Sequence, residues 1–323
     1  SSETSMLIFA YLMNSPIKKI AIIGTGVIGA GWTIRLLAKN KIVNVYDPNI
    51  SQLNFLKNEI RRVSKSVLRF YKKNKLNIYN LYFNNSIKDA VKDADLIQEN
   101  APENLNIKKK IVKEISKWAK PNAIIASSSS GLLPTKIQQS CKLPERFLIA
   151  HPFNPVYLLP LVELVKGKKT KIKFIKKSKI FYQSIDMYPL ILKKEVEGYL
   201  SDRLQESMWR ESLHILNEDL ASSDDLDKAI IHGPGLRWAL MGNFLTFHLA
   251  GGKLGMKHTL EQFGPTLKIP WTKLKAPNLT KKLSNKIIRE TKKQSKGASI
   301  KELTTMRDNF LVDLLKLKNK YKF

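Results

Sequence analysis

A histidine, a carboxylate and a run of serines occupy positions that suit a proton-transfer site. His151 directly follows a strand-like run at residues 147–150, and the four serines at 127–130 directly follow another run at 122–126. In an open α/β sheet, ligands bind beyond the carboxyl ends of the strands, where these groups would converge. Histidine titrates near neutral pH, so His151 could take a proton from a substrate hydroxyl as hydride leaves the same carbon. Glu163 is the obvious carboxylate to hold the other ring nitrogen, fix the tautomer and stabilise the imidazolium.

A site for the hydride acceptor is indicated near the start of the chain. The isoleucine-rich run at residues 18–23 leads into the pattern G-x-G-x-x-G, and an acid follows the first glycine by 23 residues. The first glycine allows a tight turn, the second lets the backbone approach a pyrophosphate, and the third lets the next helix pack on the sheet. The N-terminus of that helix faces the phosphates with unpaired N–H groups. We therefore predict dinucleotide binding by Gly24, Thr25, Gly26, Val27, Ile28, Gly29 and Asp47.

Asp47 also indicates which dinucleotide binds. It ends a second strand-like run, at residues 41–46, where a carboxylate can accept hydrogen bonds from the adenosine ribose. A carboxylate at this point favours a free 2′-hydroxyl and repels a 2′-phosphate, and no arginine directly follows it. The sequence therefore predicts NAD rather than NADP as the cofactor.

These groups need a scaffold, and the order of the apolar runs describes one. Helix-like stretches, for instance at residues 30–40 and 104–118, separate short apolar runs, as in a doubly wound sheet with β-α-β connections. The expected fold class is therefore α/β. We expect these runs to be buried parallel strands: 18–23, 42–46, 94–98, 122–126, 147–150, 160–165 and 188–192.

The pattern changes from about residue 195. Apolar residues recur every fourth position from Val196 to Met208, which is typical of a helix, and no strand pattern stands out after them. Capping boxes, in which an acid follows a serine by three positions, indicate further helix starts at Ser222 and Ser299. We therefore expect three parts: an extension at 1–16, an NAD-binding Rossmann domain at 17–193 and a helical substrate and dimerisation domain at 194–323.

The composition is strongly basic, which raises the question of nucleic-acid binding. The 323 residues include 56 lysines and arginines against 27 acids, a formal net charge of +29. Of these basic residues 46 are lysines spread along the whole chain, and no helix-turn-helix, zinc-finger or RNP-like pattern accompanies them. We interpret the charge as a solvated lysine surface and expect no nucleic-acid partner.

We expect no membrane span, disulfide or metal site. The longest apolar run, at residues 6–13, is far shorter than the roughly 20 residues that cross a bilayer, and it lacks the flanks of a signal peptide. Cys141 is the only cysteine, so no internal disulfide can form, and the histidines make no close metal-binding pair. These features favour a cytoplasmic protein without a bound metal.

Several of these features together resemble the 3-hydroxyacyl-CoA dehydrogenase superfamily. They are the glycine-rich strand, the run Gln-Glu-Asn-Ala-Pro-Glu-Asn at residues 98–104, the serine block, and His-Pro-Phe-Asn-Pro at 151–155 with its later Glu163. The resemblance covers nearly the whole chain from residue 17. It implies a Rossmann-like sheet, an all-helical C-terminal domain like that of 6-phosphogluconate dehydrogenase, NAD as cofactor, and a homodimer formed through the helical domain.

The resemblance also assigns roles to the residues that would act at the reacting carbon. His151 matches the catalytic base and Glu163 matches its carboxylate partner. Ser130 matches the serine that hydrogen-bonds the reacting oxygen, and Asn154 matches the asparagine beside the nicotinamide. These four residues form the predicted catalytic set.

Two further positions follow the family pattern and one departs from it. Glu103 and Lys108 match a pair along the cofactor and substrate cleft. Asp202 stands where the acyl-CoA enzymes carry an asparagine. Because a carboxylate cannot donate as an amide does, Asp202 is left out of the predicted catalytic set.

Within the superfamily, segments at 151–163 and between 233 and 265 resemble the bacterial members that oxidise the 3-hydroxyl of L-carnitine to 3-dehydrocarnitine. A trimethylammonium group cannot donate a normal hydrogen bond, so proteins usually hold it against aromatic faces. An arginine could bind the substrate carboxylate through two oxygens. The aromatic residues at 238–247 could instead fill a helix–helix core. We expect the substrate to be bound by Tyr157, Arg237, Trp238, Phe244 and Phe247, with Trp271 as a further candidate.

Other functions stay open on the sequence. The nearest rivals oxidise a 3-hydroxyacyl-CoA or L-gulonate within the same superfamily. A hydrolase with Ser130, His151 and Glu163 as its triad is disfavoured, because G-x-S-x-G and the chain order Ser–acid–His are both absent. A binding or structural protein without turnover is disfavoured because the whole predicted catalytic set is present.

Overall fold

A computed structural model describes residues 16–265, 272–273, 275, 278 and 280–320. Contacts divide the described chain into two compact units. The first ends at Asp202 and also takes in Thr305–Leu317, while the second contains Arg203–Thr304. Only the last residue of the expected extension at 1–16 is among the described residues, and the domain boundary at residue 193 stays a prediction.

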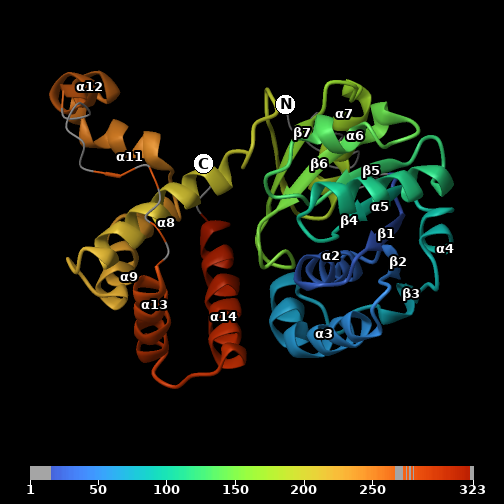
Figure 1. Cartoon of the computed structure of the whole chain (residues 1–323), viewed down its shortest axis with the longest axis horizontal. Coiled ribbons are helices and arrows are strands. Elements are labelled where there is room, and N and C mark those ends of the chain that lie inside the picture. Colours follow the sequence, from blue (N-terminus) through green and yellow to red (C-terminus); the bar gives the residue numbers. More distant parts are fainter. Residues whose placement is uncertain (1–15, 266–271, 274, 276–277, 279, 321–323) are drawn as a thin grey trace. The chain divides into compact units, whose positions relative to one another are not determined.

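The first unit is built on one eight-stranded sheet, in the order β3-β2-β1-β4-β5-β6-β7-β8 (Figure 1). The predicted doubly wound α/β sheet is confirmed, although the short strand β3 was not expected. The prediction of parallel strands is wrong for the last two, since β7 pairs antiparallel with β6 and parallel with β8. The strands are β1 (Lys19–Ile23), β2 (Ile42–Tyr46), β3 (Leu81–Phe83), β4 (Leu96–Glu99), β5 (Ile124–Ser127), β6 (Phe147–Pro152), β7 (Leu161–Lys166) and β8 (Tyr188–Ile191).

Helices cover both faces of this sheet, because successive side chains of each buried strand point to opposite sides. Ile20 and Ile22 of β1 pack in the core beneath α2, α3 and α7, whereas Ala21 and Ile23 pack in the core beneath α4, α5 and α6. The helices are α2 (Val27–Ala38), α3 (Ile50–Tyr71), α4 (Ile87–Val91), α5 (Leu105–Trp118), α6 (Pro134–Gln138) and α7 (Ile172–Ser184), with 3-10 turns η1 (Ile78–Asn80) and η2 (Pro144–Arg146).

A buried arginine ties α2 to the segment that follows the histidine strand. Arg35 is fully buried and donates to the backbone carbonyls of Val156, at 2.7 Å, and Leu159, at 2.9 Å. Its remaining nitrogen donates to the carbonyl of Ile185 just before β8. Since buried carbonyls need partners, this one side chain stabilises the connection between β6 and β7 and so the placement of both strands.

Every regular element among the described residues of the second unit is a helix, as the sequence predicts. The predicted capping box at Ser222 is present, with Asp225 as its second member, and Ser299 and Glu302 exchange the same pair of bonds. The helices are α8 (Ser201–Asn217), α9 (Ser223–Ile231), α10 (Pro234–Trp238), α11 (Asn243–Ala250), α12 (Met256–Phe263), α13 (Lys281–Gln294) and α14 (Ile300–Lys318), with the 3-10 turn η3 (Gly252–Leu254).

The last helix, α14, begins in the second unit, but its residues 305–317 pack on the first. Val312 is fully buried in the core beneath α3. Asp308 is almost fully buried and accepts a 2.6 Å hydrogen bond from the hydroxyl of Tyr157, with Arg62 of α3 at 3.7 Å. A buried carboxylate needs such partners, and these contacts assign this stretch of α14 to the first unit.

Helix α8 begins later than its apolar pattern indicates. The four-residue spacing predicts a helix from Val196, yet α8 starts at Ser201. Gly198 and Tyr199 have positive φ angles of 72° and 48°, which end any helical path through them. Because of this break, the N–H groups of Leu200 and Ser201 at the start of α8 are available to an acceptor, which is Glu163.

Candidate active site

The glycine-rich turn opens a groove on the first unit. Gly24, Gly26 and Asp47 line it, together with Asn100 and Ala101 after β4. The groove has a volume of about 1370 Å³ and lies at the carboxyl ends of β1, β2 and β4. The strand order reverses between β1 and β4, which is where doubly wound sheets bind their ligands.

The residues of this turn fit the pyrophosphate of a dinucleotide. Gly24 has a φ of +89°, and a Cβ there would lie 2.8 Å from the carbonyl oxygen of Asn100. A Cβ on Gly29 would lie 1.9 Å from the carbonyl oxygen of Gly24, so α2 can approach the turn only without a side chain. Gly26 faces open space, with its nearest atom at 3.9 Å, and supplies no side-chain cap to α2. The first N–H groups of α2 are thus available to an anion.

Asp47 is held at the rim of the groove by the backbone on both sides of it. One carboxylate oxygen accepts from the N–H of Thr25 at 2.7 Å, and the other accepts from the N–H of Asn49 at 2.9 Å. The first oxygen also accepts from the Thr25 hydroxyl at 3.3 Å, whereas the second keeps a lone pair that can accept from a ribose hydroxyl. This position agrees with the predicted role of Asp47.

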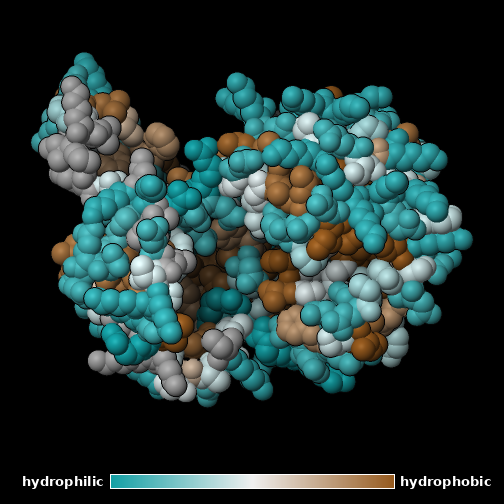
Figure 2. All heavy atoms as spheres, viewed as in Figure 1, coloured by the Kyte–Doolittle hydropathy of each residue, from teal (hydrophilic) through white to brown (hydrophobic). Residues whose placement is uncertain are grey.

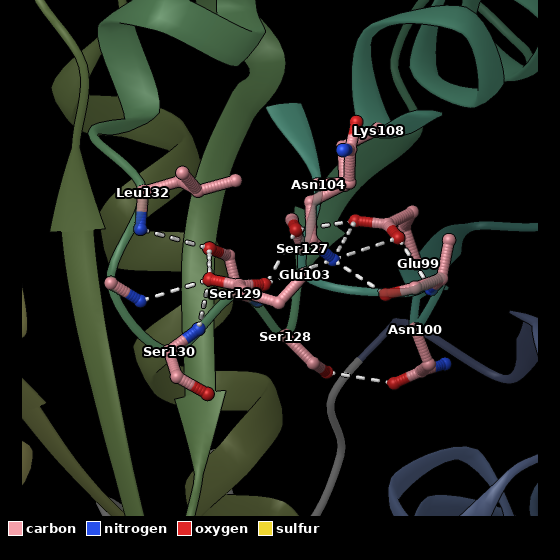
Figure 3. A network of polar contacts seen from close by, with 12 residues as sticks. Glu99, Asn100, Glu103, Asn104, Lys108, Ser127, Ser128, Ser129, Ser130 and Leu132 are labelled. Carbon is pink, nitrogen blue, oxygen red and sulfur yellow. Dashed lines mark hydrogen bonds and ion pairs between the residues drawn. The ribbon is translucent and has the colours of Figure 1, made fainter. Parts of the chain in front are cut away.

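Lys108 has a different main partner from the one predicted. Its ammonium lies 3.1 Å from Glu99 and 3.5 Å from Glu103, and both Lys108 and Glu99 are almost completely buried (Figure 3). Lys108 also donates to the carbonyl of Ala101, and the Ser127 hydroxyl donates to Glu99. Because a buried charge needs close partners, this network supports a scaffold role for Lys108 beneath the cofactor groove.

Glu103 organises the serine loop. One of its oxygens accepts from the Ser129 hydroxyl at 2.6 Å and from the N–H groups of Ser130 and Gly131, each at 3.0 Å (Figure 3). Burial raises the pKa of Glu103, but these hydrogen bonds and the charge of Lys108 outweigh it and lower the pKa below its ordinary value. The Ser130 hydroxyl points away from this carboxylate and is exposed.

His151 and Glu163 are direct partners across two strands. Because β7 runs antiparallel to β6, the register places Glu163 opposite His151, and Nδ1 lies 2.9 Å from Oε2. The ring of His151 is 6% exposed, whereas the Glu163 side chain is completely buried. The predicted pair is therefore brought together by the sheet itself.

Glu163 also receives the first N–H groups of α8. Its Oε1 accepts from the N–H groups of Leu200 and Ser201, each at 3.0 Å, and Oε2 accepts from the Ser201 hydroxyl at 2.7 Å. Burial raises the pKa of Glu163, but hydrogen bonds from His151, Ser201 and Leu200 lower it below the ordinary value. The carboxylate is consequently ionised at neutral pH and can only accept.

This arrangement determines which ring nitrogen of His151 can react. Since ionised Glu163 has no hydrogen to donate, the hydrogen of a neutral imidazole must lie on Nδ1. The lone pair on Nε2 is then left to accept a proton. The nearest charged group to Nε2 is Asp202, whose Oδ2 lies 3.6 Å away.

Tyr199 connects the serine loop to the histidine. Its ring centroid lies 5.4 Å from that of His151, and its hydroxyl donates to the carbonyl of Leu132 at 2.8 Å. The ring is fully buried, which raises the pKa of the Tyr199 phenol far above its ordinary value. Tyr199 therefore stays neutral and acts as a rigid spacer between the two loops.

The other predicted residues are distributed over both units. Asn154 is exposed just beyond β6, and the ring of Tyr157 is 4% exposed with its hydroxyl bonded to Asp308. A ring so deeply buried offers no face to a ligand, so we leave Tyr157 out of the proposed substrate site. The remaining four residues lie on α10 and α11 of the second unit, namely Arg237, Trp238, Phe244 and Phe247. Trp271, the further candidate, lies outside the described residues.

Sequence reasoning missed three contributors to this site. Glu99 lies within the family-like run at 98–104, but only the buried contact identifies it as the partner of Lys108. Ser201 and Tyr199 lie in the segment that departs from the expected helix. Gly198, which directly precedes Tyr199, is the sequence signal that could have indicated a break in the helix there, because glycine readily adopts a positive φ.

The described residues contain neither a metal-binding cluster nor a helix fit to span a membrane. In that part of the chain, no three histidine, cysteine or acidic side chains gather as a metal site would require. None of the helices described there has the length and apolar character of a bilayer span. Hydrophilic residues cover much of the face seen in Figure 2.

Comparisons with known families match almost the whole described fold. The model of the 3-hydroxyacyl-CoA dehydrogenase NAD-binding domain matches residues 19–196, and that of the 3-hydroxyacyl-CoA dehydrogenase C-terminal domain matches residues 198–297. Both domains predicted from the sequence therefore have counterparts in one family.

Curated relatives and solved structures extend this result. An L-carnitine dehydrogenase of Bacillus cereus is 48% identical, over 95% of this chain and 94% of its own length. An L-carnitine dehydrogenase of Oceanobacillus iheyensis is 47% identical, over 94% of this chain and 99% of its own length. A solved NAD⁺-dependent dismutase, a 5-dehydrogenase of a pyridine carboxylic acid, superposes with a TM-score of 0.78 at 24% identity, over 95% of this chain and 100% of its own. At that identity the structural likeness bears on the fold alone.

Proposed function

Because the chain belongs to the 3-hydroxyacyl-CoA dehydrogenase family, we propose that it is an NAD-dependent dehydrogenase that oxidises the 3-hydroxyl of L-carnitine to 3-dehydrocarnitine. The similarity to L-carnitine dehydrogenases over nearly the full length supports the substrate. The hydrogen bond between His151 Nδ1 and Glu163, with Nε2 left as an acceptor, supports the chemistry and is the observation that carries the proposal.

His151 is the proposed general base. Bound NAD supplies a nicotinamide ring that accepts hydride from the carbinol carbon. Nε2 takes the hydroxyl proton, and Glu163 stabilises the resulting imidazolium through Nδ1, 2.9 Å away. Because α8 and Ser201 already hold Glu163 in place, the imidazole needs no reorientation when its charge appears.

Six other residues are proposed to orient the substrate and cofactor. The exposed hydroxyl of Ser130 hydrogen-bonds the reacting oxygen, while its N–H is anchored on Glu103. Asn154, exposed beyond β6, would contact the nicotinamide of bound NAD. For the trimethylammonium and carboxylate groups, the sequence pattern alone supports Trp238, Phe244, Phe247 and Arg237.

A steady-state assay tests the proposed function directly. L-carnitine with NAD should form NADH, and L-gulonate, a 3-hydroxyacyl-CoA and D-carnitine should each give a much lower kcat/KM. D-carnitine is the matched control, because it has the same groups and charges in the opposite configuration. NADH formation from L-gulonate or the thioester, but not from L-carnitine, would assign the chain to one of the rival activities.

The Asp47 carboxylate should make the enzyme prefer NAD. We expect NADP to bind at least about 10-fold more weakly, because its 2′-phosphate would meet a fixed carboxylate. Asp47→Ser should reduce the ratio of the Kd for NADP to the Kd for NAD, as measured by fluorescence titration with both nucleotides. Asp95→Ser is the control, because Asp95 accepts two backbone N–H bonds at the opposite end of the sheet. Equal affinities in the wild-type protein would contradict the role of Asp47.

We further propose a homodimer formed through the second unit. Leu245 and Leu249 lie one turn apart on α11, and both are exposed, at 46% and 62%. Exposed apolar side chains grouped in this way favour a covered face. Light scattering should give the mass of two chains, and the double substitution Leu245→Asp with Leu249→Asp should halve it. Leu220→Asp, at a 70% exposed leucine after α8, should leave the mass unchanged.

A further inference from the structure

Asp202 lies on the reactive side of His151, and no proposed step so far uses it. Its Oδ2 is 3.6 Å from Nε2, the nitrogen that would take the substrate proton. The Asp202 side chain is 33% exposed, whereas Glu163, on the other side of the ring, is completely buried. The imidazole thus has one carboxylate enclosed in the protein and a second that faces solvent on the side where a substrate would arrive.

The backbone holds Asp202 in this position. It is the second residue of α8, directly after Ser201, whose N–H and hydroxyl both donate to Glu163. The preceding N–H of Leu200 donates to the same carboxylate. Glu163 is also hydrogen-bonded to His151, so the same carboxylate holds both the first turn of α8 and the imidazole. Glu163 therefore fixes the distance between Asp202 and Nε2.

An alcohol bound at Nε2 would bring its neighbouring atoms close to this second carboxylate. In L-carnitine the quaternary nitrogen is only two bonds from the carbinol carbon. A trimethylammonium group has no hydrogen to donate, so a carboxylate attracts it by charge and discriminates against an uncharged group of equal shape. A substrate with an anion at that position would be repelled.

We infer that Asp202 is a specificity-determining residue that selects substrates with a cationic group beside the carbinol carbon. The inference rests on the proposed function and extends it by naming the charge that the site recognises. The trimethylammonium is then attracted by a carboxylate of the first unit, whatever aromatic groups also contact it.

A second role for Asp202 must be separated from this one. A carboxylate near Nε2 also stabilises the protonated imidazole, which would assist the oxidation of any alcohol. That effect acts on His151 alone, so it would change the kcat/KM of all substrates by the same factor. Recognition of the cation would instead change only the values for cationic substrates.

The test compares L-carnitine with its uncharged carbon isostere, 3-hydroxy-5,5-dimethylhexanoate of matching configuration. This compound replaces the quaternary nitrogen by carbon and keeps the alcohol, the carboxylate and the shape. In Asp202→Asn we expect kcat/KM for L-carnitine to fall about 10- to 100-fold more than kcat/KM for the isostere, mainly through KM. Asp202→Glu, which keeps the charge, should recover part of the preference for L-carnitine.

Each outcome separates the inference from the proposed function. Asp224→Asn is the matched control, because it removes a first-turn acid from α9 and should leave the ratio of the two substrates unchanged. Equal losses on both substrates in Asp202→Asn, or no loss on either, would overturn the inference while leaving the dehydrogenase activity in place. A wild-type enzyme without turnover of L-carnitine would instead overturn the proposed function before any variant is made.

Discussion

His151→Ala should lower kcat for L-carnitine oxidation by about 10³-fold or more, since positioned proton transfer typically contributes 10²- to 10⁴-fold. The expected cause is the loss of Nε2, the only ring nitrogen that ionised Glu163 leaves available as an acceptor. Affinity for NAD should change little, because Gly24, Gly26 and Asp47 line a groove to which His151 does not contribute. Single-turnover kinetics and nucleotide titration on the same preparation measure the two effects.

His232→Ala is the matched control for this substitution. His232 is exposed at the C-terminal end of α9 in the second unit, and its removal also replaces an imidazole by a methyl group. Its kcat should stay within about twofold of the wild-type value, as for most surface substitutions. If His151→Ala retained wild-type turnover, the assignment of the base would be wrong.

Glu163→Gln should lower kcat by about 10²- to 10⁴-fold while the imidazole stays present. The amide cannot accept from all the groups that now converge on the carboxylate, namely the N–H groups of Leu200 and Ser201, the Ser201 hydroxyl and His151. An amide that turns its NH₂ toward His151 would favour the tautomer with the hydrogen on Nε2, and that nitrogen could no longer accept a proton. The reasoning parallels the loss of activity when an orienting aspartate of a catalytic triad becomes asparagine.

Stability separates a structural effect of this change from a catalytic one. Glu195 is a matched control, because its carboxylate also accepts from a backbone N–H and a hydroxyl, both of Thr135, in the same unit. We expect Glu163→Gln and Glu195→Gln to lower the free energy of unfolding by similar amounts, about 1–3 kcal/mol, measured by urea denaturation. Only Glu163→Gln should lower kcat, and equal activity losses would refute the orienting role of Glu163.

Local sequence patterns were sufficient for much of the fold and of the site. The apolar run before Gly24 and the spacing to Asp47 identify the cofactor turn. Its glycines are required by steric limits that neighbouring residues impose. The capping boxes at Ser222 and Ser299 are equally local and are both present. His151 could be singled out because few other side chains titrate near neutral pH.

Strand direction, by contrast, depends on pairing between distant segments. The apolar run at 160–165 has the same composition whether it runs parallel or antiparallel to its neighbour. The antiparallel pairing of β7 with β6 is what places Glu163 opposite His151. The prediction of their contact was therefore confirmed even though the predicted direction of the strand was wrong.

The chain by itself determined which residues could do the chemistry, and the tertiary structure decided which of them meet. Nothing in the apolar spacing from Val196 indicates that α8 begins at Ser201, so that its N-terminus holds Glu163 and brings Asp202 to 3.6 Å from His151. The pairing of Lys108 with Glu99 likewise required the buried packing of α5 on β4. The physical reason is that turns and caps are set by neighbouring residues, whereas the partner of a buried charge is set by non-local packing.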